Sequence, residues 1–200
     1  MSDESGAEQV TETHLFRLPG GESVLLRAIR PQDADGLQAY MRNLSAPTRH
    51  NRFLGAVSEF APAELERLTH MGGPREWAWI VFAHAGSTAI IAEAIQIVAP
   101  KAQYCEIALS VTDVWQRRGV GTLLLTTMEC RARTLGARYL VGDVLRTNDA
   151  MKGLARKAGF AIRGHFRDAR LIEIVKDLSS PKTCFWIRAR WPTTQSILCD

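Results

Sequence analysis

The chain has 200 residues, of which 25 are Lys or Arg, 21 are Asp or Glu and 46% are hydrophobic, a composition that predicts a globular protein with one substantial core. It excludes collagen, coiled coils and a chain that is disordered throughout. The longest apolar runs, at residues 77–85 and 89–98, are shorter than the ~18 residues of a membrane span, so no membrane association is expected.

The first 13 residues contain four acidic residues, no basic one and no apolar run, and are predicted to be a disordered acidic tail rather than a targeting signal. Without them the net charge rises from +4 to +8, which suits an anionic ligand. No repeat or linker interrupts the remainder, so residues 14–191 are predicted to form a single domain, followed by a short tail at 192–200.

The cysteines form no CxxC pair and no Cys/His cluster; they are Cys105, Cys130, Cys184 and Cys199. Neither a metal site nor a disulfide framework is therefore expected. A reducing cytoplasm is the expected location.

The first half of the domain is predicted to contain a hairpin, three helices and three strands. A Pro-Gly-Gly turn at residues 19–21 joins the two hairpin strands. The three later strands have short breaks between them, which predicts an antiparallel meander. The hairpin strands are expected at residues 14–18 and 23–30, the helices at 31–43, 45–55 and 62–73, and the meander at 77–85, 89–98 and 103–111.

In the second half, apolar residues recur at helical spacing over residues 120–135, which predicts an amphipathic helix. A strand at 139–145 and a helix at 150–158 are predicted to follow. Strand, helix and strand in this order predict a βαβ crossover with parallel strands. Further strands are expected at 161–166, 171–176 and 184–190. The predicted fold is α/β of the α+β type: a mixed, mostly antiparallel twisted sheet with helices on both faces. The apolar run 185–187 near the chain end favours a subunit interface and hence a homodimer.

The junction between the strand ending at Val111 and the helix from residue 120 is the most specific chemical signal. The first turn of a helix has unpaired N–H groups and a partial positive charge, so it can bind a phosphate. Gly119 and Gly121 would let an anion approach the main chain, and Arg117 and Arg118 add charge. The segment is neither a Walker loop nor a GxGxxG dinucleotide-binding fingerprint, because the residues that these two motifs require are absent. An ordinary glycine-rich turn is the alternative on these residues alone.

The segment QRRGVG at residues 116–121 resembles the Q/R-x-x-G-x-G/A pyrophosphate loop of the GNAT superfamily of acyl-CoA N-acyltransferases. The following strand, Asn148, short helix and Gly-Phe at 159–160 match that family in order and spacing, and so does the segment LRAIRPQDA at 26–34. The resemblance covers residues 23–176. Within the superfamily, Leu44-Ser45, Arg49 and Arg52-Phe53 are similar to the catalytic domain of bacterial protein lysine acetyltransferases.

The resemblance implies the GNAT fold, with a V-shaped opening where the strands at 103–111 and 139–145 diverge and acetyl-CoA as cosubstrate. A backbone N–H in this opening would stabilise the oxyanion of the reaction. An N-cap role for Asn148 and a solvated helix face for Arg156 are the alternatives. The residues implied to bind the cofactor are Leu109, Val111, Gln116, Arg117, Arg118, Gly119, Val120, Gly121, Thr122, Asn148 and Arg156.

Glu106 is the candidate general base, because it stands in an apolar strand where burial would raise its pKa, and it matches the position of a glutamate base in the lysine acetyltransferases. A structural ion pair with an arginine of a neighbouring strand is the alternative. The family's tyrosine, the proposed acid for the departing thiolate, is replaced by Ala155, which leaves Tyr104 and Tyr139 as substitutes.

The predicted function is transfer of an acetyl group from acetyl-CoA to a primary amine, either a protein lysine or a small molecule, directly in a ternary complex. No cysteine with a His partner stands in the motif region, which disfavours an acyl-enzyme. A non-catalytic acyl-CoA-binding or sensor domain is the alternative. Nucleic-acid binding is not expected, because there is no basic stripe with interleaved aromatic residues.

Overall fold

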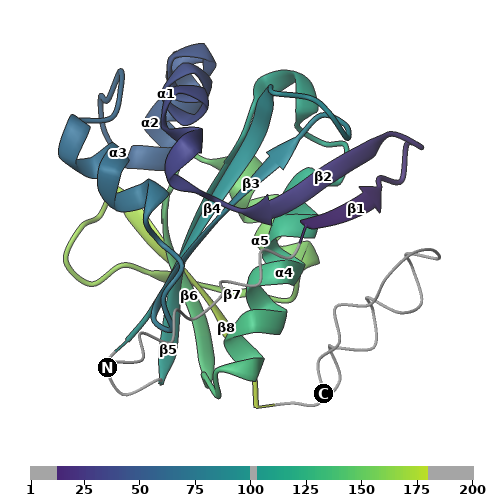
Figure 1. Cartoon of the computed structure of the whole chain (residues 1–200). Helices are drawn as coiled ribbons and strands as arrows, with labels where there is room; N and C mark the ends of the chain where they lie inside the picture. Colours follow the sequence, from purple (N-terminus) through teal and green to yellow (C-terminus); the bar gives the residue numbers. More distant parts are fainter. Residues whose placement is uncertain (1–12, 100–102, 180–200) are drawn as a thin grey trace, which may run out of the picture.

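A computed structural model describes residues 13–99 and 103–179. Its strands form a single eight-stranded sheet in the order β1-β2-β3-β4-β5-β6-β8-β7 (Figure 1). The strands are β1 (Thr13–Arg17), β2 (Ser23–Ala28), β3 (Glu76–Phe82), β4 (Ile90–Val98), β5 (Tyr104–Val111), β6 (Tyr139–Leu145), β7 (Ala161–Gly164) and β8 (Leu171–Asp177). Thr13, the last residue of the predicted N-terminal tail, is the first residue of β1. The rest of the predicted tails, the strand at 184–190 and the apolar run at 185–187 lie outside the described residues.

Helices cover both faces of this sheet, as the sequence predicts. The α-helices are α1 (Ala34–Asn43), α2 (Ala46–Phe53), α3 (Pro62–Thr69), α4 (Val120–Thr134) and α5 (Asp149–Lys157), and two short 3-10 turns are η1 (Pro31–Asp33) and η2 (Asp113–Trp115). In Figure 1, α1 to α3 lie at the upper left of the strands and α4 lies on the other side. None of the described helices has the length and apolar character that crossing a bilayer requires.

The alternation of side chains along β3 divides the core between the two faces. Ile80 packs in the hydrophobic cluster under α1 and α3, whereas Trp79 and Val81 belong to the cluster under α4 and α5. Successive side chains of a strand point to opposite faces, so a run that is apolar at every position is the expected sequence for a strand covered on both sides. Residues 78–82 are such a run, and all are buried.

The pairing of successive strands agrees with the predicted hairpin, meander and crossover. Neighbouring strands from β1 to β5 pair antiparallel, and β5 and β6 pair in parallel across α4. The strand β8 inserts between β6 and β7, pairing antiparallel with both. The mixed, mostly antiparallel sheet of the prediction is thereby confirmed.

Candidate active site

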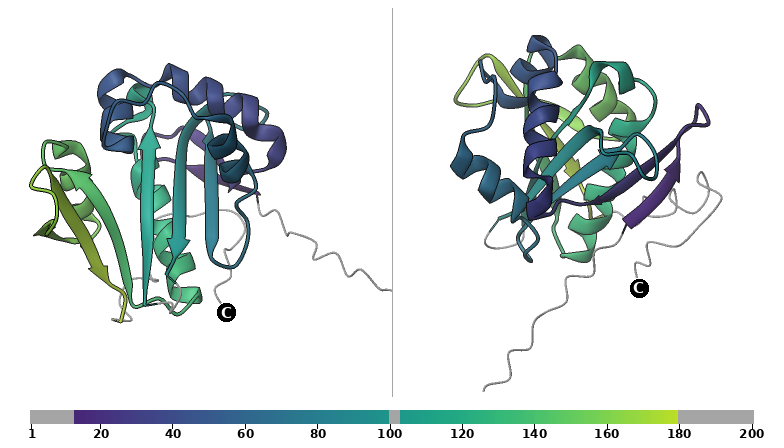
Figure 2. Two further views of the ribbon diagram at one scale, coloured as in Figure 1. Left: turned by 90° about the vertical axis from the view of Figure 1, so that its left-hand side faces the viewer. Right: turned by 45° about the horizontal axis from the view of Figure 1, so that its top comes forward.

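Strands β5 and β6 are paired at one end only. Their parallel register joins Tyr104 to Tyr139 and ends where Glu106 meets Val141. Beyond that point the two strands diverge, as the left view of Figure 2 shows. The main-chain groups of β5 that face β6 beyond Glu106 are therefore outside the ladder and open to a ligand. This arrangement is the V-shaped opening that the resemblance implies.

A cleft of ≈ 930 Å³ follows the opening from β5 to the N-terminal ends of α4 and α5. The cleft brings together most of the cofactor-binding residues that the resemblance implies. The exceptions are Val120, which is fully buried, and Arg156, in place of which Lys157 lines the cleft. Those that line it are Leu109, Val111, Gln116, Arg117, Arg118, Gly119, Gly121, Thr122 and Asn148.

The loop before α4 has backbone N–H groups that are not bonded to the residues that the structure describes. Among the described residues, the amides from position 117 to position 122 donate no hydrogen bond to the protein. Arg117 and Gly119 have φ angles of 59° and 102°, which turn the chain sharply into the helix. Six free donors at a helix N-terminus form a suitable cradle for a diphosphate.

Both glycines of the loop also have packing roles that the sequence did not indicate. A Cβ at Gly119 would stand 2.9 Å from the Cδ atom of Pro19, and one at Gly121 would stand 2.9 Å from a methyl group of Leu154. The glycines therefore allow the hairpin turn and α5 to approach the loop, in addition to leaving room for an anion.

Polar side chains fasten α2 to this loop. Asp113 of η2 accepts hydrogen bonds from the hydroxyl groups of Ser45 and Thr48 at 2.8 and 2.9 Å. The Gln116 amide donates to the Thr48 hydroxyl at 3.2 Å and to the Val111 carbonyl at 3.1 Å. Desolvation raises the pKa of Asp113, but the hydrogen bonds from Ser45 and Thr48 outweigh it and lower this pKa below 3.8. The side chain of Gln116 is thus engaged in holding the loop.

Two further cofactor-site residues of the prediction have protein partners. Asn148 is the N-cap of α5, and its side chain accepts from the amide of Met151 at 3.0 Å, while the residue also lines the cleft. Arg118 pairs with Glu22 at 3.0 Å, so its charge is shared with the turn between β1 and β2.

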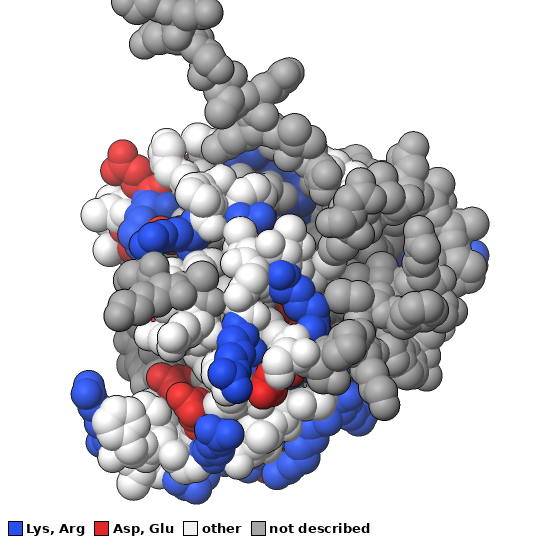
Figure 3. All heavy atoms as spheres, turned by 90° about the horizontal axis from the view of Figure 1, so that it is seen from below, with Lys and Arg blue, Asp and Glu red and all other residues white. Residues whose placement is uncertain are grey.

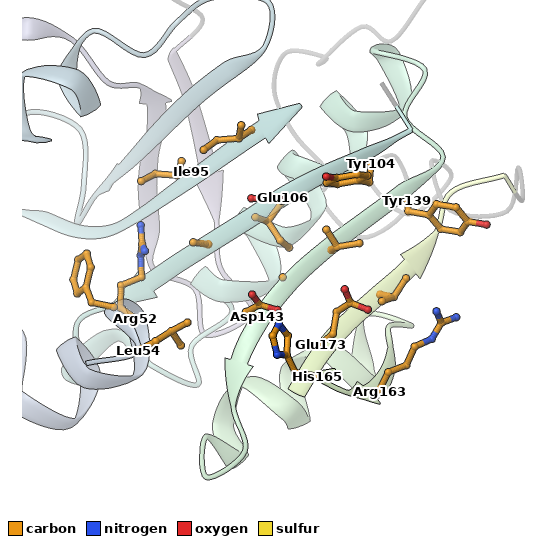
Figure 4. A pocket seen from close by; sticks show the side chains of 17 residues that line it. Arg52, Leu54, Ile95, Tyr104, Glu106, Tyr139, Asp143, Arg163, His165 and Glu173 are labelled. Atoms are coloured by element: carbon orange, nitrogen blue, oxygen red, sulfur yellow. Dashed lines mark ion pairs between the residues drawn. The ribbon is translucent and has the colours of Figure 1, made fainter. Parts of the chain in front are cut away.

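A second cavity, of ≈ 660 Å³, lies over β4, β5, β6 and β8, which are consecutive in the sheet. Figure 4 shows three carboxylates along these strands, one on each: Glu106, Asp143 and Glu173. The two cavities adjoin at the point where β5 and β6 separate. The residues that line both are Arg52, Ile107, Ala108, Gly142 and Asp143.

The expectation that Glu106 is buried is wrong. Its side chain is exposed to the second cavity, and it forms no ion pair with a described residue. The buried carboxylate of this region is Glu93 on β4, which pairs with Arg52 at 2.6 Å. Sequence reasoning missed Glu93, Arg52 and Asp143 as site residues; only Arg52 had a signal, as part of a motif.

The tyrosines proposed as substitute acids lie on the second cavity. Tyr104 and Tyr139 both line it, at the end where β5 and β6 are still paired, and neither lines the larger cleft. Ala155 on α5 is completely buried. The position at which the family carries its tyrosine is therefore closed to the cleft and has no proton donor in this chain.

Charged side chains of both signs are interspersed over the face seen from below (Figure 3). Within the described ranges, no three His, Cys, Asp or Glu side chains are grouped as metal ligands.

Comparison with known proteins identifies the family. A model described as an acetyltransferase (GNAT) domain matches residues 23–161. The Pseudomonas aeruginosa protein named acetyltransferase PA5475 is 28% identical over 144 residues, which cover 72% of this chain and 77% of that protein.

Solved structures agree in fold. The GNAT domain of S. lividans PAT has a TM-score of 0.75 at 22% identity, covering 87% of this chain and 99% of that one. Spermidine N-acetyltransferase from Vibrio cholerae, solved with CoA and spermine, has a TM-score of 0.63 at 19% identity, covering 78% and 96% of the two chains. The family model spans β2 to α5, and thus both diverging strands and the loop before α4; the chain belongs to the GNAT family of acetyltransferases, which use acetyl-CoA for N-acetylation.

Proposed function

We propose that this protein transfers the acetyl group of acetyl-CoA to a cationic primary amine, directly and in a ternary complex. The supporting observation is that a cofactor-sized cleft and a carboxylate-lined cavity adjoin where β5 and β6 part. Acetyl-CoA occupies the larger cleft with its diphosphate on the loop before α4. The amine enters through the second cavity and reaches the thioester at the junction.

Two carboxylates of the second cavity, Glu106 and Glu173, form no ion pair with a described residue and favour a cationic acceptor. Arg52 and Arg163 also line this cavity, and His165 stands 3.9 Å from Asp143. Glu106 pairs in register with Val141, and Asp143 lies two residues further along β6, so both carboxylates share one face of the sheet. Glu173 is opposite both Asp143 and Arg163 in the register. A carboxylate attracts an ammonium group more strongly in a partly enclosed cavity than in bulk water. A protein lysine is the leading acceptor and a small-molecule amine is the second.

Glu106 acts as the general base, through a water molecule in the open cavity. The ammonium group loses one proton to Glu106, and its nitrogen attacks the thioester carbon. The C–S bond then breaks to release CoA thiolate, and the second proton of the nitrogen passes through water to the thiolate, which leaves a neutral amide and CoA thiol. The described cysteines, Cys105 and Cys130, are buried and line neither cavity, which disfavours an acyl-enzyme.

The substitution Glu106→Gln tests this proposal. We expect kcat to fall by roughly 100-fold or more, because a positioned base contributes about that factor, while CoA affinity is unchanged. Thiol release from acetyl-CoA is measured with a panel of lysine peptides and small amines, and CoA binding is measured by calorimetry.

Glu59→Gln is the matched control, because Glu59 is an exposed partner of Arg42 and lines neither cavity. CoA binding by the unmodified protein without turnover of any amine would contradict the enzymatic proposal and favour the acyl-CoA sensor.

A further inference from the structure

Arg52, on α2, is a buried arginine that lines both cavities. Its side chain is 10% exposed, and its Nε atom donates to Oε1 of Glu93 at 2.6 Å while Nη2 donates to Oε2 at 3.2 Å. Glu93 comes from β4, in the middle of the sheet. Burying two charges is costly, and a pair that only fastened α2 to the sheet could be replaced by apolar residues at little loss.

The carboxylate of Glu93 is itself fixed by a buried chain of hydroxyl groups. Ser110 donates to Oε1 of Glu93 at 2.8 Å, and the Tyr40 and Ser110 hydroxyls are 2.9 Å apart. Because the Ser110 proton is directed to Glu93, the Tyr40 hydroxyl is the donor to Ser110. Burial and the charge of Glu93 raise the pKa of Tyr40 well above its usual range, so this donor keeps its proton. Glu93 is thus held from two sides, and Arg52 is held by Glu93.

One nitrogen of the guanidinium group remains available. Nη1 of Arg52 donates to no described residue, and it is not among the fully buried side-chain atoms that lack a partner. The nitrogen is therefore not completely enclosed, and its residue lines both cavities. Of the residues that line both cavities, Arg52 is the cation and Asp143 is the anion. A fixed donor therefore opens onto the place where the thioester and the amine meet.

We propose that Arg52 is a catalytic residue of the transfer, whose Nη1 N–H groups hydrogen-bond the acyl oxygen as negative charge develops on it. The proposal rests on the proposed function, because it needs the thioester at the junction of the cavities. When the amine nitrogen bonds to the acyl carbon, the electron pair of the C=O π bond moves to oxygen; it returns as the C–S bond breaks. Glu106 has by then taken one proton from the ammonium group, and the second proton of the nitrogen leaves toward the departing thiolate.

Arg52 itself transfers no proton in this step. Burial alone would lower the pKa of its guanidinium group, but the carboxylate of Glu93 outweighs that effect and raises it. A preorganised donor of this kind acts by stabilising charge that appears only in the transition state. Loss of Arg52 should accordingly lower kcat more than it raises KM.

The test is Arg52→Lys, which keeps the positive charge beside Glu93 but removes the planar group that reaches both Glu93 and the junction. We expect kcat to fall about 100-fold or more, with CoA affinity and the KM for acetyl-CoA within about threefold of the unmodified protein. The pH–rate profile should keep its shape at reduced height, because Arg52 does not titrate.

Arg27→Lys is the matched control. Arg27 forms a comparably buried pair with Asp33, with both bonds at 2.6 Å, and lines neither cavity. It should lose thermal stability to a similar extent and keep kcat. Should Arg52→Lys fail to fold, the double variant Arg52→Gln/Glu93→Gln removes both charges together and should show the same loss of kcat in a folded protein.

The two proposals fail in distinguishable ways. A folded Arg52→Lys protein with kcat within twofold of the unmodified enzyme overturns the role of Arg52 and leaves the enzymatic proposal intact. A shift of the pH–rate profile also overturns it, because it would assign a proton-transfer step to this region. An unmodified protein that turns over no amine contradicts the proposed function itself.

Discussion

Gly119 combines a φ angle of 102° with a neighbour that leaves no room for a side chain, since a Cβ there would be 2.9 Å from Pro19. Gly119→Ala should lower the free energy of unfolding by about 1–3 kcal/mol, because alanine would adopt a strained backbone conformation and push the hairpin turn away. CoA affinity should fall as well, since this residue belongs to the turn that we propose binds the diphosphate. Urea denaturation and calorimetry measure the two effects.

Gly136 provides the control for this substitution. Its φ angle is 71°, yet a Cβ would have no atom within 4 Å, so Gly136→Ala isolates the backbone strain. We expect it to cost about 1 kcal/mol and to leave CoA binding unchanged. Equal losses of stability in the two variants would show that the Pro19 contact relaxes freely.

At the scale of single residues, the sequence could not predict which acidic side chains of the strands are exposed. Glu93 and Glu106 both stand in apolar strands, yet one is buried with Arg52 and the other faces a cavity. The difference lies in what covers the sheet, because Arg52 of α2 lies over Glu93, whereas the side chain of Glu106 opens into the second cavity although its strand is still paired on both sides. The loop could be placed between a strand and a helix from its residue types, because glycines mark a turn, whereas its role as a pyrophosphate loop came from the family resemblance.

At the scale of elements, α2 is attached to the loop between β5 and α4 through Asp113. The pKa of Asp113 is lowered in the folded state, so its ionised carboxylate stabilises the fold above pH 3.8. This stabilisation is lost as the pH falls through the lowered pKa of the folded protein. Asp113→Asn keeps the shape and removes the charge. We expect this variant to be less stable than the unmodified protein at about pH 6 and the difference to shrink below about pH 3.8.

Urea denaturation across this pH range measures that difference. Ser45→Ala removes one of the hydrogen-bond donors to Asp113. In a protein with this substitution, Asp113→Asn should cause a smaller loss of stability. A difference that stayed constant down to about pH 3 would show that the charge of Asp113 contributes nothing to the attachment.

The positions of most helices and strands could be predicted because turn residues and changes of period separate them. Pro31 and Pro62 start helical segments, and Gly136 and Gly159 follow the ends of α4 and α5. The insertion of β8 between β6 and β7 was beyond such reasoning, because pairing between strands is decided by tertiary contacts rather than by local residue types.

For the molecule as a whole, the opening between β5 and β6 divides the sheet into two parts. On one side β1 to β5 pair antiparallel in chain order, and on the other β6, β8 and β7 form their own antiparallel group. A ligand bound between the two parts is expected to stabilise both, by about 2.7 kcal/mol when its concentration is 100 times Kd.

Gly142 is the residue that sets this opening at its narrow end. A Cβ on it would stand 3.0 Å from the Ile107 carbonyl oxygen, and the residue lines both cavities. Gly142→Ala should therefore shift β6 relative to β5 and weaken CoA binding about tenfold, which is about 1.4 kcal/mol. The thermal stabilisation by saturating CoA is the measurement. Gly164→Ala on β7, where a Cβ meets no atom within 4 Å, should retain the full stabilisation, and an equal response of the two variants would place the cofactor away from the diverging strands.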